Sequence, residues 1–91
     1  MTGRRQGPGA ALDRALIGAN VRAARERAGL SRWALAAEVY GLGVASLYEG
    51  ALARVEHGHR DLLLTEAAAL ARALGIRVET LVEGTTVGAG L

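Results

Sequence analysis

The chain has 91 residues, of which 51% are hydrophobic, and it carries a formal net charge of +2 at pH 7. We expect a single domain, since this length holds one hydrophobic core. Cysteine is absent, which excludes disulfides, thiolate metal ligands and thiol catalysis and fits a reducing compartment. Phe is absent as well, while Ala and Leu are frequent. Such a composition favours close-packed short helices over a sheet, so we predict an all-α protein.

The charge is distributed unevenly along the chain. All 11 basic residues are Arg, a usage typical of a GC-rich bacterial or phage genome. Residues 1–32 contain seven Arg and two acidic residues, whereas residues 33–91 contain four Arg and seven acidic residues. A basic first third favours a polyanionic partner. A solvated, charged helix face would give the same counts and stays open as the alternative.

The N-terminal segment lacks the pattern of a signal peptide. After Arg4 and Arg5, the chain continues with Gly-Pro-Gly where an apolar stretch would be required. The most apolar stretch, residues 33–48, contains Glu38 and is too short to cross a bilayer. We therefore expect a cytoplasmic protein without a membrane partner. Its predicted parts are a flexible basic arm at 1–11, a folded domain at 12–84 and a flexible tail at 85–91.

Two helices are predicted in the first half of the domain. Apolar residues recur at helical spacing from about Leu12, and Gly29 is placed to end that helix. Ser31 is the predicted N-cap of a second helix, which runs from Arg32 to about Val39. Two glycines follow closely and predict a turn.

The start of the third helix is open between two readings. Ser46 and Glu49 match a capping box, which predicts a helix from Ser46 to the stop at Gly58. Gly50 weakens a helix at that position, so a start nearer Glu49, after a longer loop, is the alternative.

The last part of the domain predicts two more helices. Thr65 is the expected N-cap of the fourth helix, which ends at Leu74 before Gly75. A short fifth helix is predicted over 78–82, before Gly84. The sequence therefore predicts a compact all-α domain of five short helices.

Three segments in order resemble a known family: LSRWALAAEV, ALARVEHGHRD and LTEAAALARALGIRVETLVEG. They are similar to the helix-turn-helix domain of the Cro and lambda-repressor type, often called the XRE family, over roughly residues 17–83. The resemblance implies a five-helix domain whose second helix crosses the DNA backbone and whose third helix enters the major groove. It implies a repressor-like transcriptional regulator that binds double-stranded DNA as a homodimer, because the family binds paired half-sites.

The resemblance also implies the roles of particular residues. At the start of the second helix, Ser31, Arg32 and Trp33 would meet phosphate, and sometimes a base. The groove-facing side of the third helix would contain Tyr48, Glu49, Gly50 and Ala53, with Arg54 one turn further along. In the following loop, His59 and Arg60 would approach the DNA backbone. On the first helix, Arg22 and Arg25 would add electrostatic contact, and Arg4 and Arg5 on the arm would enter a minor groove.

Two departures from the family pattern favour a second function. The spacing from Ser31 to Glu56 is longer than usual, with the extra residues in the predicted turn at 40–47 between the second and third helices. Between Val44 and Ala53 the chain also has no Arg, Lys, Asn or Gln, the usual readers of base edges. Leu47 and Tyr48 remain for contact with thymine methyl groups. The alternative is therefore a protein–protein interaction module, whose interface would be the apolar loop with Tyr40, Leu42 and Val44.

The remaining polar and aromatic residues have plain structural interpretations. His57 and His59 form a pair, but metal sites need further ligands, so we expect no metal. Trp33 is expected to be partly buried, and Glu56 to bond within the fold, for example to an Arg. No nucleophile–base pair is apparent. We therefore expect no enzymatic activity, no cofactor and no small-molecule substrate.

Overall fold

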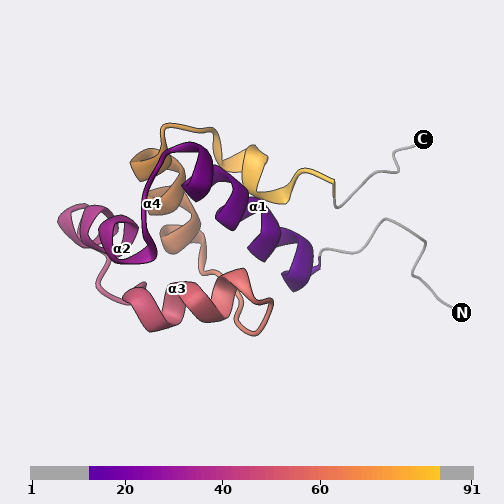
Figure 1. Ribbon diagram of the computed structural model, residues 1–91, viewed down its shortest axis with the longest axis horizontal. Coiled ribbons are helices and arrows are strands. Elements are labelled where there is room, and N and C mark those ends of the chain that lie inside the picture. The colour runs from indigo at the N-terminus through magenta and orange to yellow at the C-terminus, as the bar shows by residue number, and fades with distance from the viewer. Residues whose placement is uncertain (1–12, 85–91) are drawn as a thin grey trace, which may run out of the picture.

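The computed structural model describes residues 13–84, which form four α-helices and one 3-10 helix (Figure 1). These elements are α1 (Arg14–Arg27), α2 (Arg32–Gly41), α3 (Glu49–Glu56), α4 (Leu64–Leu74) and η2 (Val78–Val82). There is no strand in this range, so the predicted all-α class is confirmed. The fifth predicted helix is a 3-10 helix. No helix of the described range is long and apolar enough to span a membrane. The predicted arm at 1–11, with Arg4 and Arg5, and the predicted tail at 85–91 lie outside the described residues.

Side-chain caps fix where the first two helices begin. Asp13 accepts a hydrogen bond from the Ala15 N–H at 2.8 Å. Ser31 Oγ accepts one from the Ala34 N–H at 3.0 Å, which confirms Ser31 as the N-cap of α2. Gly29 adopts a left-handed conformation, with a φ of 74°, and ends α1 as predicted. Helix α2 continues to Gly41 rather than ending near Val39.

The predicted capping box of the third helix was wrong. Tyr48, not Ser46, is the N-cap of α3. The Ser46 hydroxyl instead donates to Glu66 Oε2 at 2.6 Å, and Glu49 is bound by Arg32. The alternative start, nearer Glu49, is confirmed. The loop between α2 and α3 therefore spans residues 42–48.

The expected N-cap of the fourth helix was also wrong. Helix α4 begins at Leu64, so Thr65 lies inside it, and Leu63 is the N-cap. A Leu side chain cannot accept a hydrogen bond. The side-chain hydrogen bond at the start of α4 comes from Glu66 instead, whose Oε1 accepts from the Leu63 N–H at 2.9 Å. Gly75, with a φ of 68°, ends the helix as predicted.

One aliphatic cluster forms the core and draws on every described element. Its most deeply buried members are Val21 on α1, Leu35 and Val39 on α2, Leu52 and Val55 on α3, Leu70 on α4, Leu81 on η2 and Leu47 on the loop. The expected contact of Leu47 with thymine methyls was therefore wrong. Leu47 anchors the loop 42–48 in the core instead.

Helix α1 crosses α3 with a close backbone approach at Gly18. A Cβ on Gly18 would overlap the carbonyl oxygen of Val55 and lie 2.9 Å from that of Glu56. Both obstacles belong to the backbone of α3, so neither can move aside as a flexible side chain would. The absence of a side chain at Gly18 therefore sets the distance between α1 and α3.

We expect Gly18→Ala to destabilise the fold by about 1–3 kcal/mol, because the methyl group would push α3 away from α1. Gly41→Ala is the matched control, since no atom lies within 4 Å of its hypothetical Cβ and its φ is not positive. Thermal unfolding followed by circular dichroism would measure both variants. Equal melting temperatures for the two would contradict the proposed close contact.

Candidate nucleic-acid interface

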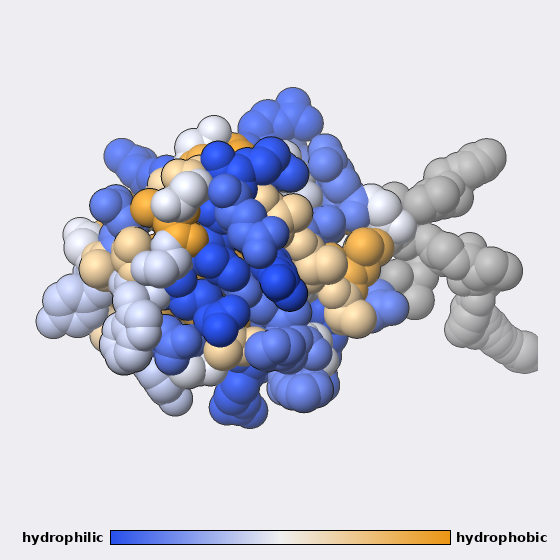
Figure 2. Space-filling view, viewed as in Figure 1, coloured by the Kyte–Doolittle hydropathy of each residue, from blue (hydrophilic) through white to orange (hydrophobic). Residues whose placement is uncertain are grey.

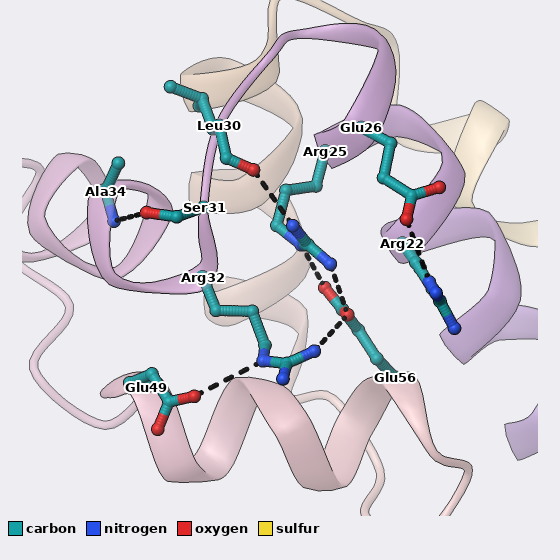
Figure 3. A network of polar contacts seen from close by, with 9 residues as sticks. All are labelled: Arg22, Arg25, Glu26, Leu30, Ser31, Arg32, Ala34, Glu49 and Glu56. Carbon is teal, nitrogen blue, oxygen red and sulfur yellow. Dashed lines mark hydrogen bonds and ion pairs between the residues drawn. The ribbon is translucent and has the colours of Figure 1, made fainter.

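A buried ion pair joins α1 to α3 (Figure 3). Arg25 Nε and Nη2 donate to the two carboxylate oxygens of Glu56, at 2.7 and 2.9 Å. The Arg25 Nη1 atom donates to the Leu30 carbonyl at 2.9 Å. These hydrogen bonds to Glu56 raise the pKa of Arg25 above its ordinary value. The expectation that Glu56 bonds within the fold, to an Arg, is confirmed.

A second arginine connects α2 to the same carboxylate. Arg32, at the start of α2, lies across the gap toward α3 (Figure 3). Its Nη1 donates to Glu56 Oε1 at 3.2 Å, and its Nε donates to Glu49 Oε2 at 3.3 Å. Glu49 and Glu56 stand at the two ends of α3. Arg32 therefore spans the helix and fixes α2 against it.

This network, made of Arg25, Arg32, Glu49 and Glu56, corrects three predicted DNA contacts. Arg25 is buried, and its Nε, Nη1 and Nη2 atoms all donate within the protein, so it is not available to a ligand. Arg32 is half-buried and its guanidinium is shared between two carboxylates. Glu49, predicted on the exposed groove-facing side, is half-buried as well. Since two cations face two anions, the network is neutral.

A second cluster corrects the prediction for Arg60. Its Nη1 and Nη2 donate to the two oxygens of Glu66, both at 2.9 Å, so it does not project freely from the loop after α3. Glu66 is fully buried and also accepts from Ser46 and from the Leu63 N–H. The hydrogen bonds from Arg60, above all, lower the pKa of Glu66 to about 2. This cluster holds the end of the loop 42–48 against α4.

The outward face of α3 carries no unpaired acidic residue, since the half-buried Glu49 at its edge is bound by Arg32. Gly50, Ala53, Arg54 and His57 follow one another at helical spacing and are exposed or half-buried, whereas the other side of α3 is buried. Arg54 is exposed and forms no ion pair with a described residue. His59 is exposed beyond the helix, and its ring centroid lies 6.3 Å from that of His57. This face is therefore neutral to cationic.

Three aromatic side chains lie exposed beside that face. Trp33 is 73% exposed, which contradicts its expected partial burial, and Tyr40 and Tyr48 are 69% and 62% exposed. All three line an apolar groove of about 230 Å³ between α2 and the loop 42–48, which we call the aromatic groove. Figure 2 shows weakly hydrophilic residues gathered at this end of the molecule, beside a strongly hydrophilic band across α1, α2 and α3.

The three residues of the predicted protein interface have different environments. Tyr40 is exposed and lines the aromatic groove. Leu42 is 43% exposed at the end of α2 but does not line that groove. Val44 is half-buried and packs against the core, so it contributes less surface than predicted.

Two further observations complete the site. Arg22 is exposed on α1 as expected, and its Nε donates to Glu26 Oε2 at 3.0 Å, one turn along the same helix. Within residues 13–84, no group of three or more His, Cys, Asp or Glu side chains is arranged to hold a metal ion.

Comparison with known proteins identifies no relative: no family model, curated protein or solved structure matches this chain.

We expect the stability of the protein to fall by about 3 kcal/mol between pH 4.5 and pH 2 through Glu66 alone. The pKa of Glu66 is lower in the folded state than in the unfolded state. The unfolded state therefore binds more protons in this range, and acid favours unfolding. Urea unfolding at several pH values would measure the free energy of unfolding. We expect it to fall less steeply with decreasing pH in Glu66→Gln than in the wild type. Glu38→Gln is the control, because Glu38 is exposed and forms no ion pair within 13–84. Parallel pH profiles for wild type and Glu66→Gln would contradict the assignment.

Proposed function

We propose that this protein is a DNA-binding, repressor-like transcriptional regulator of the helix-turn-helix type. In this proposal α2, the loop 42–48 and α3 form the motif, and α3 enters the major groove. The protein acts as a homodimer on paired half-sites, because one domain of this size covers little DNA. The resemblance of three ordered sequence segments to the XRE family supports the same assignment.

The outward face of α3 is the observation that carries the proposal. A surface that approaches phosphates must avoid unpaired carboxylates, since like charges repel. The two carboxylates of α3, on Glu49 and Glu56, are both neutralised by internal arginines. The face then offers Arg54 and His57 next to two small residues, Gly50 and Ala53. Small side chains allow the helix backbone to come close to base edges.

The start of α2 supplies the contact with the DNA backbone in this proposal. The first N–H groups of a helix attract anions, and they carry the positive end of the helix dipole. Ser31 and Trp33 are exposed at this end, and Ser31 keeps the cap in place. These groups keep the phosphate contact that the resemblance implies for them, while the guanidiniums of Arg25 and Arg32 lie in the internal network.

The composition of the α3 face also predicts how sequence is read. Arg54 is its one guanidinium, so a contact with guanine O6 and N7 is the main direct reading of a base. Tyr48 adds apolar contact at the start of the helix. The remaining specificity comes from the shape and flexibility of the DNA. We therefore expect a modest preference for particular DNA sequences and an affinity that falls strongly with salt.

The aromatic groove favours a second candidate function, a protein–protein interaction module on the same fold. Exposed Tyr and Trp side chains are typical of the centres of protein interfaces. The edge of the groove at Tyr40, on the last turns of α2, lies outside the face that α3 would present to DNA. A partner bound there would leave Arg54 uncovered.

We expect Arg54→Ala to weaken binding to duplex DNA by at least about fivefold and to lower the slope of affinity against salt by about one counterion. Arg72→Ala is the matched control. Arg72 is also exposed, lies in the last turn of its own helix α4 and has no ion pair within 13–84. Fluorescence anisotropy with a pool of random duplexes, followed by sequencing of the bound fraction, would measure both.

Equal loss in the two variants would show that binding depends on net charge and not on α3. If the wild type binds no duplex even at low salt, the DNA-binding function is wrong and the protein–protein interaction module takes its place.

A further inference from the structure

Helix α3 ends in a His-Gly-His sequence whose backbone is fixed by hydrogen bonds. His57 is the C-cap of α3, and Gly58 follows in a left-handed conformation, with a φ of 78°. The Gly58 N–H donates to the Val55 carbonyl at 3.0 Å, and the His59 N–H donates to the Arg54 carbonyl at 2.8 Å. These two bonds form a Schellman motif, which closes the helix end. The motif therefore sets the positions of both histidines relative to α3.

The imidazole rings of the two histidines lie close together at the surface. Both residues are exposed, and their ring centroids are 6.3 Å apart at an interplanar angle of 33°. Since an N–H donor lies about 2.7–3.2 Å from the oxygen that accepts from it, two rings at this separation can both donate to the oxygens of one phosphate group. His57 also continues the outward face of α3, one turn beyond Arg54. The pair therefore lies where that face ends.

The carboxylates around the pair are bound within the fold. Within residues 13–84, the charged side chains on the last turn of α3, the following loop and the start of α1 are Arg54, Glu56, Arg60, Asp61, Asp13 and Arg14. Asp61 is bound by Arg14, and Glu56 is bound by Arg25. Asp13 accepts from the Ala15 N–H, and Arg60 binds Glu66. Arg54 has no ion pair in this range, so a phosphate that approaches the histidines meets an unpaired guanidinium beside them.

Protonation determines what these rings offer to a phosphate. A neutral imidazole donates from one nitrogen, whereas a protonated imidazole donates from both and carries a positive charge. Two positive rings 6.3 Å apart repel each other, and an anion held by both offsets that repulsion. The C-terminal end of a helix carries a partial negative charge, so a phosphate is accepted there only beside cations. Binding of a phosphate and uptake of protons are therefore coupled, and each favours the other.

We propose that His57 and His59 together bind one phosphate of the DNA backbone and take up protons as they do so. This inference deepens the proposed function and rests on it, since DNA supplies the phosphate. The end of α3 then holds the backbone while Arg54 contacts a base. Because the protonated rings are the binding form, the affinity for DNA falls as the pH rises. The change falls between about pH 5 and pH 8, the range in which histidine ordinarily changes its charge.

Binding of the full chain to random duplexes, measured at several pH values by fluorescence anisotropy, tests the proposal. Ionic strength is held constant and phosphate buffer is left out. We expect the affinity of the wild type to fall by at least about fivefold from about pH 6 to about pH 8. The variant with both His57→Gln and His59→Gln should bind weakly and equally at every pH. The variant with both His57→Arg and His59→Arg should bind tightly at every pH, because a guanidinium stays charged.

The matched control separates this site from a general effect of charge. The chain contains two His and no Cys, so the glutamine double variant has no side chain that ordinarily changes its charge in this range. Arg72→His in that variant adds an imidazole on the exposed last turn of α4, away from α3. The dependence on pH should stay absent. Circular dichroism would confirm that each variant is folded.

Three results would overturn the inference and leave the proposed function in place: a wild-type affinity that does not change with pH, a glutamine double variant that keeps the wild-type profile, or a profile restored by Arg72→His. A wild type that binds no duplex at any of these pH values would reject the proposed function, and the inference with it. The failure of the phosphate site is thus distinguished from the failure of DNA binding as a whole.

Discussion

The carboxylate of Glu56 is the point on which the arrangement of the first three helices depends. It receives Arg25 from α1 and Arg32 from α2 while it is itself buried at the end of α3. A charge in this position is tolerated only because it is fully paired, and removing one partner of such a pair costs about 3–5 kcal/mol. Gly18 complements it sterically, since the close crossing of α1 and α3 brings Arg25 within reach of Glu56.

The same pairing determines what the surface offers to a partner. Arg25 and Arg32 belong to the basic first third of the chain, which on composition alone favours a polyanionic partner. Their charges are neutralised by the carboxylates of Glu49 and Glu56 inside the protein. In return, the carboxylates of α3 do not repel phosphate. The net result is a small outward face of α3 with Arg54 as its main cation, beside the aromatic groove.

The sequence predicts the elements more accurately than the side-chain contacts. Helix ends follow local signals, such as the cap at Ser31 and the stops at Gly29 and Gly75, and these signals do not depend on distant residues. The error at the start of the third helix arose because a distant residue competes for a local group. Ser46 has the sequence of a capping residue, but it donates to Glu66, which is 20 positions away.

The site residues show the same division. From sequence alone, Arg side chains are predicted to be exposed. The sequence contains no signal that Arg25 or Arg60 faces a buried carboxylate on another element. The prediction that Glu56 would pair with an Arg was the one available hint, and it did not identify Arg25 as its main partner. Trp33 was misplaced in the opposite direction, because a large ring is buried on average, whereas here the ring is 73% exposed and lines the aromatic groove.

The loop 42–48 is anchored near its end and open around Gly43, and this has a consequence for changes in its length. Leu47 holds its last part in the core, and Ser46 ties it to α4 through Glu66. Gly43, with a φ of 93°, has no atom within 4 Å of the place where a Cβ would be. Residues added or removed near Gly43 would change the contour of the protein beside α3 without moving α3. The loop thus works as a spacer of adjustable length, in which new binding surface can be acquired while the helix that would read DNA keeps its position.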